Sequence, residues 1–303
     1  MESLTLLLIC LVAGVLLQRS RSFPPTAPTT LNQFVLYVPL PALALYHIPE
    51  IEVGYELLFP VGVAWISFGL AWAVFATLGK ALGWSNKLVG CLILTAGLGN
   101  TSFVGFPVVE ALFGKQGLST ALLVDQPGSF VVLSTLGIVV ANVYAGERPS
   151  AGSMARKILL FPPFIAFILA VLLNAFDMHL HKVVRGALLR LGSTVTPIAL
   201  IAVGLQLRFD RRSKHLGFLG LGLFFKLMVV PAVLYLLYIH VLNGSGPVVR
   251  ISLIEAAMAP MITGAVLASS YGLKPRLANM MVGVGVPLSL LTLLLWNYVL
   301  QGV

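Results

Sequence analysis

The residues most able to do chemistry in this chain are polar side chains that interrupt long apolar stretches. Three of them are consecutive, Asn100, Thr101 and Ser102, and they lie between Gly97 and Pro107 in a run that holds two more glycines. This combination is incompatible with a continuous helix, because glycine weakens a helix and proline removes a backbone donor. In lipid, broken backbone is tolerated only where protein packs on it or where it lines a water-filled cavity.

A second interruption follows in the other half of the chain, at Ala259–Gly264, where Pro260 lies 160 positions after Asn100. Two interrupted helices in corresponding positions indicate a transporter binding site. Their half-helix N-termini would direct free N–H groups and positive dipole ends toward one point, which favours an anion. The alternative is that proline and glycine only kink two packed helices.

Ionisable groups inside apolar segments are a second signal, because their burial in a membrane is unfavourable and they usually face a cavity or a partner. Asp125 and Gln126 precede a proline at position 127, and Glu255 lies five residues before Pro260. We expect these three side chains to bind a coupling H⁺ or Na⁺. Asp125 could instead only hydrogen-bond to the broken helix.

Lys226 is the one basic residue well inside an apolar segment, and two interpretations stay open for it. It could supply a counter-charge to a carboxylate of the protein or the substrate, or its long stem could snorkel to the cytoplasmic surface. Cys10 and Cys91 have no paired spacing, so no metal site is predicted. Phosphate-loop and nucleophile motifs are absent from the sequence, which argues against an enzyme, and no cofactor is expected.

The composition indicates which kind of secondary structure positions these residues. Of 303 residues 58% are hydrophobic and 10% charged, with a mean hydropathy of +0.99, so lipid surrounds most of the chain. The apolar runs are continuous and not alternating, which predicts an all-α integral membrane protein. Ten segments of suitable length are predicted: 3–18, 31–47, 57–79, 88–113, 117–144, 157–176, 186–207, 216–240, 249–270 and 276–300.

The net charge of +9 comes from basic residues in short loops beside these segments, so it is expected to set topology and not to bind nucleic acid. When loops are assigned alternately to two sides, most of the lysines and arginines collect on one side, which is then cytoplasmic. The sequence therefore predicts a multi-pass protein of the cell (inner) membrane with both termini outside the cytoplasm.

Weak internal echoes suggest duplication after the fifth segment. Pro41–Leu45 resembles Pro197–Ile201, and Pro127–Ser129 resembles Pro287–Ser289 at a similar offset. With five helices per half, the second copy would enter from the opposite side as an inverted repeat. The predicted organisation is a first repeat at 1–144, a cytoplasmic linker at 145–157 and a second repeat at 158–303, with broken helices four and nine crossing.

The run Gly99–Pro107 resembles the glycine, asparagine and proline signature of the auxin efflux carrier family, which contains plant PIN-type carriers and bacterial permeases. Glu255–Pro260 and Gly204–Leu207 match it further, and Asp125-Gln126 resembles a feature of bacterial members. The resemblance implies a homodimeric elevator carrier with helices 1, 2, 6 and 7 as scaffold and helices 3–5 and 8–10 as transport domain. The resemblance also implies a set of substrate-binding residues, to which we add Ser102 because it belongs to the same polar triplet. The set is Asn100, Thr101, Ser102, Pro107, Pro260, Met261 and Thr263.

The expected function is secondary active transport of a small organic anion across the lipid bilayer. Bacterial relatives are linked to malate- or malonate-like carboxylates, and auxin-like acids are the other class that the resemblance implies. Two alternatives stay open. One is a sodium-coupled bile-acid-type symporter, which has the same helix plan, and the other is a membrane sensor or scaffold that moves no solute.

Overall fold

The computed structural model describes residues 2–20, 23–24, 26–51, 54–146, 152, 159–206 and 216–302, and the described part is all-helical. The α-helices are α1 (Glu2–Leu17), α2 (Ala27–Tyr37), α3 (Pro39–His47), α4 (Leu58–Ala81), α5 (Asn86–Ala96), α6 (Phe106–Phe113), α7 (Gly117–Leu123), α8 (Ile138–Ala145), α10 (Pro162–Ala175), α11 (Lys182–Gly192), α12 (Val195–Gln206), α13 (Leu216–Phe224), α14 (Val230–Tyr235), α15 (Pro247–Ala256), α16 (Ile262–Ser270) and α17 (Pro275–Val299). The π-helical turns are Thr101–Gly105, Val124–Phe130, Leu133–Gly137, Phe225–Val229 and Leu236–Val241, and the 3₁₀ turns are Ile48–Glu50, Tyr55–Leu57 and Leu300–Gly302.

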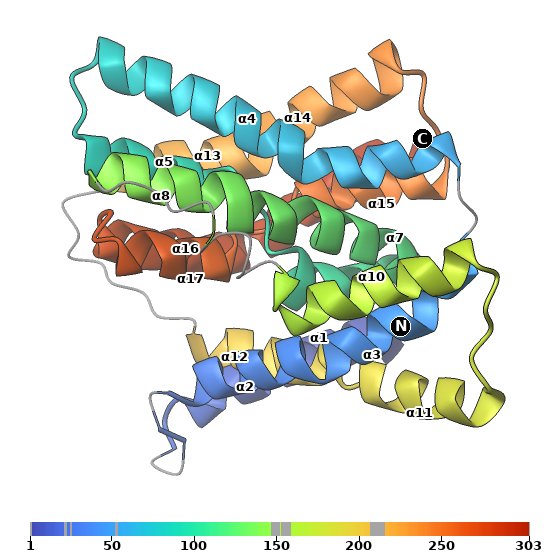
Figure 1. Cartoon of the computed structure of the whole chain (residues 1–303). Helices are drawn as coiled ribbons and strands as arrows, with labels where there is room; N and C mark the ends of the chain where they lie inside the picture. The colour runs from blue at the N-terminus through green and yellow to red at the C-terminus, as the bar shows by residue number, and fades with distance from the viewer. Residues whose placement is uncertain are drawn as a thin grey trace.

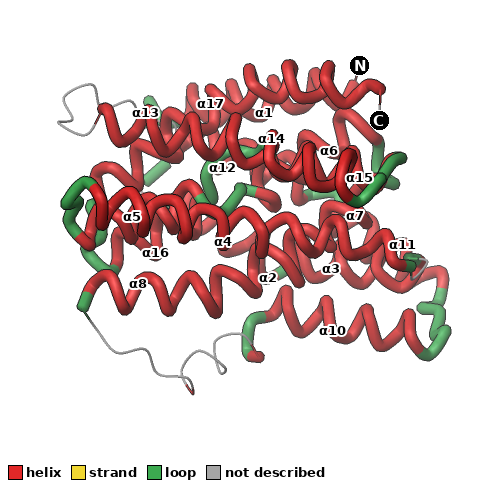
Figure 2. Tube along the Cα trace, turned by 90° about the horizontal axis from the view of Figure 1, so that it is seen from above, coloured by secondary structure: helices red, strands yellow, loops and turns green. Residues whose placement is uncertain are grey.

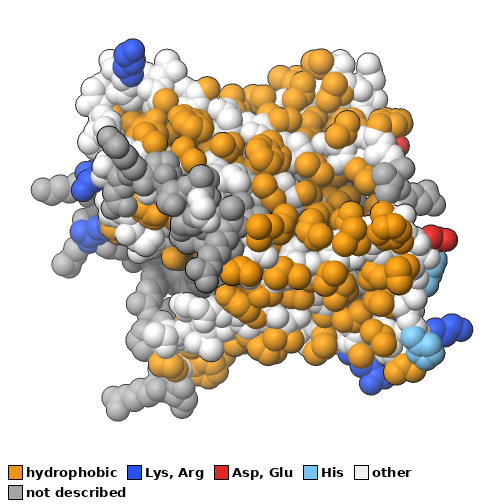
Figure 3. Space-filling model, in the orientation of Figure 1, with side chains coloured by type: hydrophobic (Ala, Val, Ile, Leu, Met, Phe, Trp, Pro, Cys, Tyr) orange, Lys and Arg blue, Asp and Glu red, His pale blue; other side chains and the backbone are white. Residues whose placement is uncertain are grey.

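Apolar side chains cover the middle of the molecule and charged ones gather at its two ends. Figure 3 shows this on one face, as a broad hydrophobic band with basic, acidic and histidine side chains toward the left and right edges. Such a surface is expected where the surrounding solvent is hydrocarbon, because charged groups are then confined to the interfaces. Within the described ranges, six helices are long and apolar enough to cross a membrane: Ala27–Glu50, Tyr55–Ala81, Gly117–Ala145, Lys182–Gln206, Leu216–Val241 and Pro275–Gly302.

The remaining predicted segments are shorter helices or interrupted ones. Leu8–Leu17 and Pro162–Ala175 are apolar but short, and the segment predicted at 88–113 is divided into Asn86–Ala96 and Thr101–Phe113. The segment predicted at 249–270 is likewise divided, into α15 and α16. The predicted linker at 145–157 lies outside the described residues except for 145, 146 and 152.

The helices form two groups, which Figure 1 shows one above the other. The lower group contains α1, α2, α3, α11 and α12, where α1 packs on α12 and α3 on α11. The upper group contains α4, α5, α8 and α13 to α17, and α10 packs on α3 between the two. Both chain termini lie at the same end of the bundle in Figures 1 and 2.

Small residues bring α1 and α12 together. A Cβ atom added to Gly14 would lie 2.8 Å from the Cα of Gly204, and the same holds in reverse, so the two backbones touch. Close backbone approach through small residues is the usual basis of helix association in lipid, where no hydrophobic force drives helices together. This contact fixes the lower group against which the remaining helices pack.

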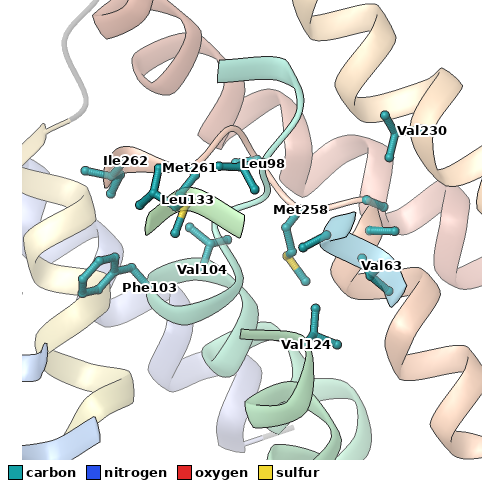
Figure 4. Packing of buried hydrophobic residues seen from close by; sticks show 14 of the residues in the cluster. Val63, Leu98, Phe103, Val104, Val124, Leu133, Val230, Met258, Met261 and Ile262 are labelled. Carbon is teal, nitrogen blue, oxygen red and sulfur yellow. The ribbon is translucent and has the colours of Figure 1, made fainter. Parts of the chain in front are cut away.

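Two non-helical segments pass each other near the centre of the upper group. Figure 4 shows buried side chains around this point, with Leu98 beside Met261 and with Phe103 and Val104 on the turn that follows. Leu98 and Met258 are fully buried and Met261 nearly so. The interior therefore surrounds two stretches of broken backbone with packed apolar side chains, as the membrane setting demands.

Candidate functional site

The two broken segments pair with each other through their main chains. Gly99 and Pro260 form an antiparallel β-bridge. The amide of Asn100 donates to the carbonyl of Ala259 at 2.7 Å, and the amide of Met261 donates to the carbonyl of Leu98 at 3.0 Å. Both helices are thus interrupted and not just kinked, and each break supplies hydrogen-bond partners for backbone groups that the other leaves free.

The Asn100 side chain starts the half-helix that follows the first break. Its Oδ1 atom accepts a hydrogen bond from the amide of Phe103 at 3.1 Å, which is an N-cap interaction. A π-helical turn at Thr101–Gly105 then leads into α6, where Pro107 occupies the first turn and needs no intrahelical donor. On the other segment α16 begins at Ile262, immediately after Met261. Two half-helix N-termini therefore start at the crossing.

A cavity of about 450 Å³ lies against this crossing. Six of the predicted site residues line it: Asn100, Ser102, Asp125, Gln126, Met261 and Thr263. Five do not, namely Thr101, Pro107, Pro260, Lys226 and Glu255. The walls contributed by the other lining residues are mainly apolar and aromatic, including Tyr37, Leu40, Phe130 and Phe161.

Asp125 is buried beside the cavity and accepts hydrogen bonds at both carboxylate oxygens. Thr101 Oγ1 donates to Oδ1 at 2.6 Å, the Ser102 hydroxyl donates to the same oxygen, and Gln126 Nε2 donates to Oδ2 at 2.6 Å. Ser129 Oγ lies 3.2 Å from Thr101 Oγ1 and extends the network. Three polar partners fix the position of this carboxyl group, and two of them are hydroxyls, which can donate or accept a hydrogen bond. The hydrogen bond to the broken helix, foreseen as an alternative role, is thus present.

Two buried polar atoms of the cavity residues have no hydrogen-bond partner in the protein. They are Nδ2 of Asn100, a donor, and Oε1 of Gln126, an acceptor. Both side chains are 1% exposed. A buried polar group without a partner destabilises the protein by the full free energy of its desolvation. Its presence in a cavity wall therefore calls for a functional explanation. These atoms offer a solute one donor and one acceptor.

Lys226 and Glu255 lie beside the crossing, are both buried and do not line the cavity. Lys226 Nζ does not reach the surface; it donates to the carbonyl of Ala256 at 2.7 Å. The Glu255 carboxylate lies against Gly105, and neither of its oxygens has a hydrogen-bond partner in the protein. It is within electrostatic range of both Lys226 and Asp125.

Some lining residues were not singled out from the sequence, although helical spacing carries the signal for most of them. Gln126, Phe130, Leu133 and Ser134 recur at i, i+4, i+7 and i+8, which places them on one helix face. Thr263, Val266, Leu267 and Ser270 do the same on α16 at i, i+3, i+4 and i+7. Leu160 and Phe161 stand before α10 without any periodic pattern, and no signal in the sequence connects them to the cavity.

A chain whose described part is helical, with an apolar belt and a mostly apolar cavity beside two interrupted helices, belongs to the class of multi-pass membrane proteins. The chain belongs to the membrane transport protein family, whose model matches residues 1–297. The resemblance to auxin efflux carriers that Gly99–Pro107 indicated is thereby confirmed.

Three curated relatives are similar over most of their length. An uncharacterized transporter of Methanothermobacter thermautotrophicus is 27% identical over 99% of this chain and 98% of its own. An uncharacterized transporter of Methanocaldococcus jannaschii is also 27% identical, over 89% of each chain. A probable auxin efflux carrier component 5a of Oryza sativa subsp. japonica is 26% identical over 76% of this chain and 75% of its own.

Proposed function

We propose that this membrane transporter is a secondary active carrier of a small organic anion, a carboxylate of the malate, malonate or auxin-like kind. The observation that carries the proposal is the pair of half-helix N-termini that start at one crossing beside a cavity of about 450 Å³. Free N–H groups and positive dipole ends at such termini favour negative charge. The unpartnered Nδ2 of Asn100 adds a donor at the same place.

The cavity wall favours a solute with one carboxylate and an apolar body. Among the lining residues that the structure describes there is no lysine or arginine to meet a second carboxylate, whereas Tyr37, Phe130 and Phe161 offer aromatic surface. A mostly apolar wall with a few placed polar groups is the usual design of a small-molecule site. We therefore expect auxin-like monocarboxylates to be preferred over malate-like diacids.

Asp125 is our candidate for coupling, together with Gln126, because an anion in the cavity would lie near its buried carboxyl group. Two like charges in a poorly solvated site repel strongly, so binding of the anion would be assisted by a proton or a cation taken up at Asp125. Co-transport of H⁺ or Na⁺ follows from this link. Glu255, the third coupling residue predicted, lies against the crossing and contributes to the same electrostatic field.

For the architecture we propose ten transmembrane helices in two inverted five-helix repeats and an elevator-type motion. The antiparallel pairing of Gly99 with Pro260 and the location of both termini at one end of the bundle support this plan. The lower helix group together with α10 would be the scaffold, and the upper group together with α6 and α7 would be the moving domain. Only a few polar contacts would then have to be exchanged, such as Thr196 to Glu110 and Ser119 to His47. A homodimer in the cell (inner) membrane with both termini outside the cytoplasm completes the proposal.

Uptake of labelled carboxylates into proteoliposomes tests the function, with the Na⁺ and pH gradients varied separately. We expect uptake of a monocarboxylate that depends on one gradient and falls at least about tenfold in Asn100→Ala and in Asp125→Asn. Asn142→Ala is the matched buried-asparagine control and Asp177→Asn the exposed-aspartate control, and both should transport normally. No uptake of any carboxylate under any gradient would favour a sensor or scaffold. Strict dependence on Na⁺ with bile-acid-like substrates would favour the bile-acid-type symporter.

A further inference from the structure

Lys226 lies beside the C-terminal end of the half-helix α15 and supplies the hydrogen-bond partner of its last carbonyl. It sits in the π-helical turn Phe225–Val229, is 1% exposed, and its Nζ donates to the carbonyl of Ala256, the last residue of α15. In a continuous helix this carbonyl would accept the amide of the residue four positions later. That residue is Pro260, which has no N–H, so the carbonyl loses its normal partner.

Main-chain atoms of both broken segments lie around this ammonium group. A Cβ atom added to Gly99 would lie 3.2 Å from Lys226 Nζ and 3.4 Å from the main-chain oxygen of Glu255, so these atoms enclose one small space beside the crossing. The Glu255 carboxylate is fully buried, has no hydrogen-bond partner in the protein and interacts electrostatically with Lys226. A freed helix carbonyl is an oxygen ligand of the kind that a small hard cation prefers, and a buried carboxyl group within electrostatic range favours positive charge beside it.

Half-helix C-terminal ends and unwound carbonyls are where transporters with broken helices coordinate their coupling cations. We propose that the ammonium group of Lys226 permanently occupies this position, as a tethered substitute for a monovalent cation. The carrier would then need no Na⁺ at the crossing. Shortening the side chain to alanine would expose a latent site for Na⁺ or a small ammonium ion.

The arrangement of the buried groups is consistent with this role. Glu255 is within electrostatic range of Lys226, whereas Asp125 is the buried carboxyl group that lines the cavity. Coupling would therefore take place at Asp125, by a proton, while the tethered cation holds the crossing together throughout the cycle. This inference rests on the proposed transport function only for its consequence on uptake and not for the existence of the latent site.

Thermal melting of the purified full chain in detergent tests the latent site without any substrate. Wild type, Lys226→Ala and Lys226→Met are each melted in choline, sodium, potassium and methylammonium chloride at equal ionic strength. We expect only Lys226→Ala to be stabilised by sodium or methylammonium, because the methionine side chain fills the space without charge. Lys87→Ala, at an exposed lysine, is the control and should respond like wild type.

The transport measurement follows in proteoliposomes with the same variants. Wild-type uptake should be the same in sodium and choline, whereas Lys226→Ala should fall by about tenfold to hundredfold in choline and recover partly with sodium or methylammonium. Wild type that melts higher in sodium, or a folded Lys226→Ala that no cation stabilises, would overturn the proposal. If Lys226→Ala does not fold, Lys226→Gln replaces it, because glutamine keeps a donor for Ala256 without the charge. Unimpaired uptake by Lys226→Gln would also overturn the proposal. Absence of uptake by the wild type would count against the proposed function alone.

Discussion

Replacing Gly105 by alanine is the sharpest test of how the crossing is packed. The added methyl carbon would lie 2.6 Å from Oε1 of Glu255 and 2.8 Å from its Cδ, and closer still to Oε2. These separations are below the contact distance of the atoms. The carboxylate would have to move, but Glu255 is fully buried and the residues around it are packed. An extra methyl group in such a core destabilises by about 1–3 kcal/mol.

Melting of the purified protein measures this effect, and a second glycine provides the control. Gly69 lies in α4 with no heavy atom within 4 Å of its added Cβ, so Gly69→Ala should melt at or slightly above the wild-type temperature. Gly105→Ala should melt several degrees lower. The difference between the two variants isolates packing from the general effect of adding alanine to a helix.

A compensating change identifies the partner. Glu255→Asp withdraws the carboxylate by one methylene group, so the double variant Gly105→Ala/Glu255→Asp should be more stable than the sum of the single variants by at least about 0.5 kcal/mol. Additivity within error, or a Gly105→Ala variant as stable as Gly69→Ala, would refute the placement of the Glu255 carboxylate against Gly105.

Three further substitutions separate structural from functional contacts. Asn100→Ser keeps a capping oxygen for Phe103 but loses the amide donor, so uptake should fall while the melting temperature stays near that of wild type. Asn100→Ala loses the cap as well, so its stability should also fall by about 0.5–2 kcal/mol. Tyr238→Phe removes the hydrogen bond to the Phe59 carbonyl, and we expect about 0.5–1.5 kcal/mol lower stability with an unchanged KM for uptake. Thr196→Val removes the hydrogen bond to Glu110, so the maximal uptake rate should change about two- to tenfold with KM unchanged; an unaltered rate would argue against sliding of the two helix groups.

The breaks in the two helices could be predicted from the sequence because backbone chemistry is local. Glycine, proline and polar side chains at Gly97–Pro107 and Ala259–Gly264 exclude a regular helix wherever they stand. The structure divides both segments at these positions. The positions of the helix ends are predicted less accurately. The segment expected at 31–47 begins with α2 at Ala27, and the one expected at 186–207 begins with α11 at Lys182. Polar residues such as Thr and Lys at these ends extend a helix beyond its apolar stretch.

Side-chain partners across the fold were not predictable in the same way. The two interpretations of Lys226 had equal support in the sequence, because stem length and distance from the helix end allow snorkelling. The structure favours the buried position, because Lys226 donates to the carbonyl of Ala256, thirty residues away. That carbonyl is available only because the break at Pro260 leaves it without its helical partner. Phe161 is a similar case, since its approach to the cavity depends on how α10 packs on α3.

From these contacts we expect the crossing to tolerate little change at Gly99. Its backbone must approach Pro260 for the main-chain pairing, and its missing side chain leaves room for the Lys226 ammonium, from which an added Cβ would be only 3.2 Å away. A larger residue would therefore disturb the antiparallel bridge and the cation beside it together. Because the bridge also fixes Asn100 and Met261 through their amides, the position of the two half-helix N-termini depends on a residue that contributes no side chain of its own.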